Sequence, residues 1–346
     1  MDKMDKKLKG PTPIDLSTFL YEKENGDQIC RKVVENLHKY GILVVKDPRV
    51  DFKKNQAFIE MLEKYFGKPT DVKMKDAHPE IFYQLGVTPH FVEKARARCQ
   101  EMKVFDKKNM PLTLCPPEKD PKWRYFWRIG PRPEKTEFAQ LNASPVIPED
   151  FPEWAEIMDN WGDRLLETAK TVAKMAAVGF GMDENVFSDF MEFGPHLLAP
   201  TGSDLAENGE KGTVFAGFHQ DLNFLTVHGK SNYPGLFVWL RTNEKIAVEV
   251  PEGCLLVQAG MQFERLTGGH VLAGFHEVVV SDETLEKMRE RKKQGKSLWR
   301  VSSTLFAHIA SDNYLEPLHP FPNDKKYPRV KAGAQVLEEL NAIINN

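Results

Sequence analysis

The stretch that decides the fold is residues 214–229, VFAGFHQDLNFLTVHG, in which two short apolar runs flank a polar turn. Runs of the same kind follow it as far as residue 309, separated by Gly, Pro and polar residues. The whole series is TVFAGF (213–218), FLTVHG (224–229), GLFVWL (235–240), IAVEV (246–250), CLLVQAG (254–260), HVLAGFHEVVV (270–280) and WRVSSTLFAHI (299–309). Short strands broken by turn residues are typical of an all-β sandwich or barrel. We therefore expect this part of the chain to consist mainly of strands.

The sequence before this region alternates between helical and extended patterns. Apolar residues recur at helical spacing over 27–40 and over 52–66, and the apolar run 42–45 after Gly41 is typical of a buried strand. Residues 106–150 are rich in Pro and predict loops with one candidate strand. The longest helical pattern, 151–182, predicts a helix packed on a sheet. For the charged segment 281–298 we expect a solvated helix inserted between two strands, with a mobile lid as the alternative.

The composition restricts the classes of protein and of partner. The chain has 346 residues, 41% hydrophobic and 28% charged, which is sufficient for one large globular domain. A net charge of -3 provides no general positive field, so neither nucleic acid nor a membrane is expected as a partner. The first ten residues are charged and no long apolar run occurs, which predicts a cytoplasmic location. The four cysteines, at 30, 99, 115 and 254, form no C-x-x-C pair and are expected to be reduced thiols.

His219 and Asp221 form a pattern that suggests a metal site. Residues two apart on a strand point to the same side, so both side chains can reach one cation. Such pairs also occur by chance, and we interpret the pair at 78 and 80 as a surface coincidence. His276, in a later strand-like run, supplies a third candidate ligand, although a lone histidine can also be a hydrogen-bonded core residue. Two histidines and one carboxylate leave positions open on an octahedral ferrous ion for a bidentate acid and O₂.

A second candidate site lies in the segment WRVSS, residues 299–303. Arg300 and Ser302 share one face of the predicted strand, so that a guanidinium and a hydroxyl can grip one carboxylate. A buried arginine requires a partner of this kind.

In their order and spacing, these segments resemble the isopenicillin-N-synthase-like branch of the Fe(II)- and 2-oxoglutarate-dependent dioxygenases. PTPIDLSTFL, the helix after it and YGILVVKDP are similar to the family's opening strand, helix and strand. FHQDLNFLTVHG resembles its iron-binding strand, VPEGCLLVQAGMQFERLTGGHVLAGFHEVVV its distal-histidine region, and WRVSS its Arg-x-Ser pair. The resemblance implies a mainly β fold with flanking helices: a double-stranded β-helix, or cupin-like jelly roll, buttressed by the long helix 151–182. It also implies one integrated unit composed of a disordered tail (1–10), an N-terminal α/β region (11–150), a jelly-roll catalytic core with the long helix (151–320), and a C-terminal extension and helix (321–346).

By the same resemblance, the protein is expected to be an oxidoreductase, a dioxygenase of specialised metabolism. His219, Asp221 and His276 would bind Fe(II), while Arg300 and Ser302 would hold the distal carboxylate of 2-oxoglutarate. With O₂ the enzyme would oxidise a C–H bond of a small, amino-acid-derived or carboxylate-bearing metabolite, by hydroxylation, desaturation or ring closure. The segment GPHLLAPTGSDL departs from the family's Asn-Tyr-Tyr-Pro motif, so a tyrosine near the co-substrate has no counterpart. The alternatives are an Fe(II) oxidase of the isopenicillin N synthase or aminocyclopropane carboxylate oxidase type without 2-oxoglutarate, and a non-catalytic binding relative.

Candidate substrate residues come from three further segments. In KWRYFWRIGPR, residues 122–132, aromatic residues alternate with basic ones, and Arg124, Tyr125 and Arg128 are candidates for receiving a carboxylate. The alternative is an edge strand whose arginines lie in water. His196 is a candidate pocket residue or an exposed loop histidine, and the pair at 262 and 263 either lines the cavity or belongs to a turn. The full set of substrate candidates is Arg124, Tyr125, Arg128, His196, Gln262 and Phe263. The sequence gives no prediction of the oligomeric state.

Overall fold

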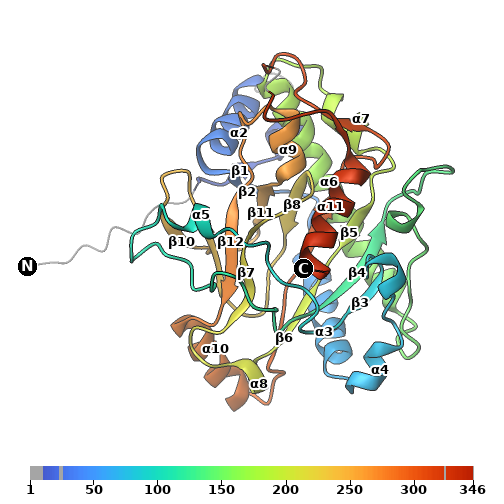
Figure 1. Cartoon of the computed structure of the whole chain (residues 1–346), viewed down its shortest axis with the longest axis vertical. Helices are drawn as coiled ribbons and strands as arrows, with labels where there is room; N and C mark the ends of the chain where they lie inside the picture. Colours follow the sequence, from blue (N-terminus) through green and yellow to red (C-terminus); the bar gives the residue numbers. More distant parts are fainter. Residues whose placement is uncertain (1–10, 23–25, 323–324, 346) are drawn as a thin grey trace, which may run out of the picture.

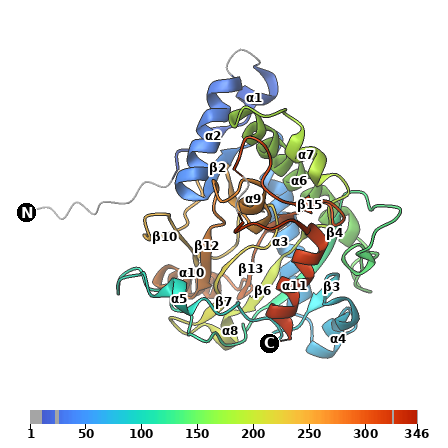
Figure 2. The same ribbon diagram turned by 45° about the horizontal axis from the view of Figure 1, so that its top comes forward.

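The computed structural model describes residues 11–22, 26–322 and 325–345. The predicted disordered tail, residues 1–10, lies outside the described residues. Two β-sheets form the middle of the molecule, and helices gather on the outer side of the larger sheet (Figures 1 and 2). Among the described helices, none is both long enough and apolar enough to cross a membrane.

The larger sheet has ten strands within the described residues. Its order is β1-β2-β11-β8-β14-β5-β4-β6-β13, and β3 pairs with β4 outside this path. Only β1 and β2 run parallel. The strands are β1 (Ile14–Asp15), β2 (Ile42–Lys46), β3 (Gly86–Thr88), β4 (Trp123–Ile129), β5 (His196–Leu198), β6 (Thr201–Asp204), β8 (Leu225–His228), β11 (Leu255–Ala259), β13 (Trp299–Val301) and β14 (Thr304–Ala307).

The smaller sheet has the order β10-β9-β12-β7, and all its pairings are antiparallel. Its strands are β7 (Val214–Gln220), β9 (Leu236–Trp239), β10 (Lys245–Ala247) and β12 (Phe275–Val279). A separate pair is formed by β15 (Tyr314–Leu315) and β16 (Val330–Lys331). Two sheets of these short strands, antiparallel except for the β1–β2 pair, make the double-stranded β-helix, so the predicted fold class is confirmed.

Helix α6 (Trp154–Gly179) is the predicted buttress, and it packs on β4, β5, β8 and β14. Its buried face includes Trp161 and Leu165, which lie in the main hydrophobic core. Gly162 allows the close approach to the sheet, because a Cβ at this position would lie 2.3 Å from Cδ1 of Ile129 in β4. The other helices are α1 (Ser17–Tyr21), α2 (Gly26–Tyr40), α3 (Phe52–Phe66), α4 (Thr70–Met74), α5 (Cys99–Met102), α7 (Val186–Met191), α8 (Leu205–Asn208), α9 (Met261–Leu266), α10 (Asp282–Lys293) and α11 (Ala332–Ile344).

Helix α10 is the predicted solvated helix, and it is inserted between β12 and β13. Ser281 caps its first turn, and the buried hydroxyl of Thr284 donates to the Pro234 carbonyl. Near its other end, Arg291 forms an ion pair with Glu63 of α3. Because these contacts anchor both ends of the helix, they do not favour the mobile-lid alternative.

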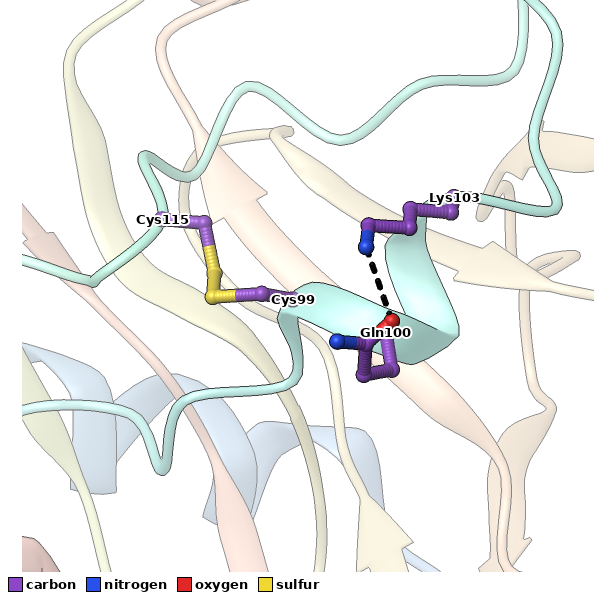
Figure 3. Close-up of a disulfide and its surroundings, with 4 residues drawn as sticks. All are labelled: Cys99, Gln100, Lys103 and Cys115. Carbon is purple, nitrogen blue, oxygen red and sulfur yellow. Dashed lines mark hydrogen bonds between the residues drawn. A yellow bond between two sulfur atoms is a disulfide. The ribbon is translucent and has the colours of Figure 1, made fainter.

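The prediction that all four cysteines are reduced thiols is wrong. Cys99 and Cys115 form a disulfide, which Figure 3 shows at the start of α5, whereas Cys30 and Cys254 are free and buried. The two bonded residues are 16 positions apart in a loop-rich segment, and the chain path that brings them together is not visible as a sequence motif.

Candidate metal centre and its two cavities

The predicted ligands meet at one end of the smaller sheet. His219 lies on β7 and Asp221 follows that strand directly, while His276 lies on β12. Because β12 pairs antiparallel with β7 and places His276 opposite His219, the two imidazoles come from neighbouring strands to the same point. The ligand atoms of all three residues lie within 4.8 Å of one another.

The separations fit a single transition-metal ion. Oδ1 of Asp221 lies 3.7 Å from Nε2 of His219 and 3.6 Å from Nε2 of His276. With metal–ligand bonds of about 2.1 Å, ligand atoms around one ion lie about 3.0 Å apart at right angles and about 4.2 Å apart when opposite. The observed values fall within this range. Two nitrogens and one carboxylate oxygen are also a donor set suited to ferrous iron.

Each ligand has a partner that orients it, as metal-binding side chains usually have. The Nδ1 atom of His219 lies 2.5 Å from the Gly217 carbonyl, and Thr226 donates to Oδ2 of Asp221 over 2.6 Å. The Nδ1 atom of His276 lies 3.1 Å from the side-chain nitrogen of Gln258.

The protonation states of the site also suit a cation. Burial and the neighbouring His276 lower the pKa of His219 to about 3, so this imidazole is neutral at physiological pH. Burial disfavours the Asp221 carboxylate, but the two histidines and Thr226 outweigh this effect, and the pKa of Asp221 lies below its usual range. The site therefore presents a carboxylate and a neutral imidazole to a metal without first releasing protons.

A cavity of about 430 Å³ opens beside the three ligands and is called the large cavity below. Arg300 and Ser302, the predicted carboxylate-binding pair, both line it. The hydroxyl oxygen of Ser302 accepts hydrogen bonds from the backbone N–H and the hydroxyl of Thr201, each over 2.9 Å. Thr201 lies in the segment where the tyrosine motif is missing, and it places a hydroxyl at this wall of the cavity.

Arg300 is buried without an anionic partner. Its side chain donates from Nε to the Pro234 carbonyl, and no carboxylate among the described residues forms an ion pair with it. Loss of water around the guanidinium lowers the pKa of Arg300 to about 10. A buried cation without a counter-charge is costly, so this position is prepared for an anion that enters the cavity.

A second cavity, of about 90 Å³, is also bordered by two of the candidate ligands and is called the small cavity below. His219, Asp221 and Arg124 border both cavities, so the candidate metal position adjoins each of them. The other walls of the small cavity include strand β4, the loop 93–98 and helix α11, together with Leu197 of β5 and Phe306 of β14.

A buried network of charges lies where the two cavities meet. Glu93 accepts from Lys122 over 3.1 Å and pairs with Arg124 over 3.0 Å, while Lys122 also contacts Asp120. The Asp120 carboxylate in turn accepts from the N–H of Gly217, two residues before His219. This network therefore joins the wall of the small cavity to the strand that carries a candidate metal ligand.

The predicted substrate residues on β4 have different surroundings. Arg124 lines both cavities, whereas Tyr125 lies in the core against Trp154 and its hydroxyl donates to the Val146 carbonyl. Arg128 is buried outside both cavities, where it donates to backbone carbonyls. The edge-strand alternative is wrong, because β4 pairs with β3, β5 and β6 and its arginines are not in water.

The remaining substrate candidates lie away from the cavities. His196 is buried on β5, where its Nδ1 atom accepts from the N–H of His308, so the exposed-loop alternative is wrong. Gln262 and Phe263 belong to helix α9 rather than to a turn. Gln262 accepts from the N–H of Ile309, and Phe263 packs in the main core.

Two histidines that line the cavities were not among the predicted residues. His228 borders the large cavity, and burial lowers its pKa to about 4. His228 lies two positions after Thr226 on β8, so its side chain points to the same side of the strand as the Thr226 hydroxyl that contacts Asp221. Alternation along this predicted strand could therefore have identified His228. His308 borders the small cavity, and burial lowers its pKa to about 3. Its position at the end of β14 carries no sequence signal of this kind.

Comparison with known proteins gives a family for the N-terminal part and a fold for the whole chain. Residues 12–150 match the model of the N-terminal region of the family described as non-haem dioxygenase in morphine synthesis. No curated protein matches the chain.

Three solved structures illustrate the likeness of fold. A protein assigned to the 2OG-Fe(II) oxygenase family in Caulobacter crescentus is 20% identical, with a TM-score of 0.73 over 96% of this chain and 98% of that one. A full-length protein from Neurospora crassa, solved in complex with alpha-KG and thymine, is 19% identical, with a TM-score of 0.73 over 97% of this chain and 98% of that one. The dioxygenase for auxin oxidation in rice is 18% identical, with a TM-score of 0.65 over 96% of this chain and 95% of that one. These structures confirm the fold that the resemblance implies, and the family match supports the resemblance over residues 12–150.

Proposed function

We propose, on the premise that the chain has the fold of the 2OG-Fe(II) oxygenases, that it is an Fe(II)- and 2-oxoglutarate-dependent dioxygenase. The observation that carries this proposal is the combination of His219, Asp221 and His276 around one point with the unpaired buried Arg300 in the adjoining cavity. A metal site of this type alone would be compatible with several reactions. The unpaired guanidinium beside it calls for an anionic co-substrate.

Each candidate site residue would have its own role in the reaction. His219, Asp221 and His276 would hold Fe(II), and Arg300 with Ser302 would receive the distal carboxylate of 2-oxoglutarate. Bound iron supplies the activation of O₂ and the oxidation of a C–H bond. The protein would orient both organic molecules beside the metal and limit the access of water, since candidate ligands border both cavities.

The substrate is proposed to be a small metabolite that carries a carboxylate, such as an amino-acid derivative, and that binds in the small cavity. With Asp221 assigned to the metal, the charged lining residues are Lys94, Arg96, Arg98, Lys122 and Arg124 against Glu93, Asp120 and Glu339. Five positive and three negative side chains leave a surplus of two positive charges, which favours an anionic ligand. Hydroxylation, desaturation and ring closure are all compatible with this arrangement.

The architecture and location are part of the same proposal. Strands β1, β2, β3 and β4, from the proposed N-terminal region 11–150, pair within the larger sheet, and α11 from the C-terminal extension borders the small cavity. These contacts support one integrated unit with a catalytic core at 151–320. A cytoplasmic location is also proposed, and fractionation of cells tests it.

Release of succinate tests the proposed function. Purified protein is incubated aerobically with Fe(II), 2-oxoglutarate and a panel of small carboxylic acids and their matched primary amides. We expect succinate that depends on iron, more of it with the acids than with the amides, and none from the Asp221→Ala variant. Consumption of O₂ without succinate would replace the proposal by the oxidase type that does not use 2-oxoglutarate. Succinate formation by the Asp221→Ala variant at the wild-type rate would remove the assigned metal site.

A further inference from the structure

The segment 93–120, called the strap below, forms part of the small cavity and crosses the outer face of the smaller sheet (Figures 1 and 2). It begins with the cavity residues 93–98 and returns to the cavity at Asp120. At this base, the N–H of Asp120 donates to the Glu93 carbonyl over 2.9 Å. The strap is therefore a loop that leaves the cavity wall and comes back to it.

The returning limb of the strap is fastened to the smaller sheet by its own hydrogen bonds. The buried carboxylate of Glu277 on β12 accepts from the N–H groups of Leu112 and Thr113 and from the Thr113 hydroxyl. The Thr113 hydroxyl oxygen also accepts from the N–H of Phe218 on β7, and the Trp239 indole donates to the Asn109 carbonyl. This limb does not depend on the disulfide for its position.

The outgoing limb is held by the hydrogen bond from the N–H of Lys94 to the Ile343 carbonyl and by the packing of Met102 and Phe105 on the smaller sheet. Between these two points it carries the cavity residues Arg96 and Arg98. Arg96 forms an ion pair with Glu339 of α11, and Arg98 forms one with Glu101 in the same limb. The side chains of Arg96 and Glu339 are 40% and 9% exposed, so water partly screens this pair. Cys99 follows Arg98 directly, and its bond to Cys115 joins the outgoing limb to the fastened one (Figure 3).

Among the cysteines in the described part of the chain, the two that form the disulfide are the accessible ones. Cys115 is exposed and Cys99 half-exposed, whereas Cys30 and Cys254 are buried. Burial raises the pKa of the Cys30 thiol to about 12, so this thiol does not compete in exchange reactions at physiological pH. A reductant in solution can therefore reach this bond, while the two free thiols are shielded from exchange with it.

We propose that the Cys99–Cys115 disulfide is a redox-sensitive clamp that holds Arg96 and Arg98 at the wall of the small cavity. A dithiol supplies the two electrons: its thiolate attacks the Cys115 sulfur, and Cys99 leaves as a thiolate that takes up a proton. The second thiol of the reductant then displaces Cys115 as a thiol and closes the reductant's own disulfide. Reduction removes the covalent tie of the outgoing limb between its contacts at Lys94 and Met102, while His276 and Arg300 keep their places on strands. The statement that a substrate binds in this cavity rests on the proposed function. The effect of the disulfide on the strap is independent of that function.

The size of the effect follows from the loop that the bond closes. For a loop of about 15 residues, the disulfide lowers the equilibrium constant for local opening of the strap by up to about 100-fold. We expect reduction to increase amide hydrogen exchange at 94–104 by about tenfold or more, and the KM of an anionic substrate to rise by about tenfold. The Kd of 2-oxoglutarate should change by less than about twofold, because the large cavity contains no residue of the strap.

Hydrogen exchange with mass spectrometry on the full chain tests the clamp without knowledge of the substrate. The protein is compared before and after dithiothreitol, and after reoxidation, with the Cys99→Ser/Cys115→Ser variant and with Cys254→Ala as the matched control. Faster exchange confined to the strap, reversed by reoxidation and reproduced by the double variant alone, supports the clamp. Unchanged exchange at 94–104 in both the reduced protein and the double variant overturns it.

The activity measurements separate a failure of the clamp from a failure of the proposed function. If reduction raises the substrate KM while kcat and the Kd of 2-oxoglutarate stay constant, the clamp acts on the small cavity as proposed. Equal KM values for the oxidised and reduced protein would overturn that role. A protein that lacks 2-oxoglutarate turnover in both redox states but still shows the exchange difference keeps the clamp and loses the proposed function.

Discussion

Replacing Arg300 by Met separates a binding role from a structural one, since the two roles predict opposite changes in stability. Burial lowers the pKa of Arg300 to about 10. From an ordinary value of roughly 12.5, and at about 1.4 kcal/mol per pKa unit, the unpaired cation costs the ligand-free protein roughly 3 kcal/mol. Met is of similar length and carries no charge. We therefore expect the free energy of unfolding of the ligand-free variant to be unchanged or to rise by about 1–3 kcal/mol.

The same substitution should weaken 2-oxoglutarate binding. A guanidinium that grips a carboxylate makes charge-assisted hydrogen bonds worth about 1.5–3 kcal/mol each, and their loss predicts a Kd raised roughly 100-fold. Urea denaturation measures the first quantity, and calorimetric titration of the iron-loaded protein under anaerobic conditions measures the second. The exposed Arg289→Met change on α10 is the control and should affect neither. A variant that loses more than about 1 kcal/mol of stability and binds 2-oxoglutarate normally would refute the reasoning.

Three further predictions concern the surroundings of the site. Thr226→Val removes the hydroxyl that orients Asp221, and the affinity for iron, measured by competition with a chelator, should fall by about 10–100-fold; equal affinities would show that this hydrogen bond has no role. Glu277→Gln removes a buried carboxylate paired with Lys245, and the free energy of unfolding in urea should fall by about 3–5 kcal/mol. The exposed Glu283→Gln control should change it by less than about 0.5 kcal/mol. Burial lowers the pKa of His308 to about 3, so between about pH 6.5 and 3 the unfolded chain binds a proton that the folded state does not. Over this range, His308 should lower the free energy of unfolding by about 1.4 kcal/mol for each pH unit of acidification. The His308→Gln variant should show a shallower dependence by one proton, and parallel curves for variant and wild type would contradict the assignment.

The fold was predictable where short-range patterns determine structure. Helix α3 begins and ends at the predicted residues, 52 and 66, because its apolar residues recur at helical spacing and face the core. The candidate metal ligands could be found because His219 and Asp221 are two residues apart at one strand end and His276 is itself on a strand. In these cases one local period fixes the direction in which a side chain points.

Sequence patterns did not predict the surroundings of residues whose neighbours come from distant parts of the chain. Alternation along β4 identified its two faces, but burial of Arg128 on one of them depends on neighbouring strands and on carbonyls brought in by tertiary structure. The walls of the small cavity come from residues near 95, 124 and 340, which no local period relates. The disulfide is a similar case, because the approach of Cys99 to Cys115 is decided by the path of the strap.

An anaerobic optical titration with Fe(II) and then 2-oxoglutarate tests whether the site binds both together. We expect one equivalent of each to give the weak visible charge-transfer band of a keto acid chelated to ferrous iron. The band should be absent from the Asp221→Ala variant, whose far-ultraviolet circular dichroism should match that of the wild type. Iron binding without this band would contradict 2-oxoglutarate as the co-substrate, and the same band in the variant would contradict Asp221 as a ligand.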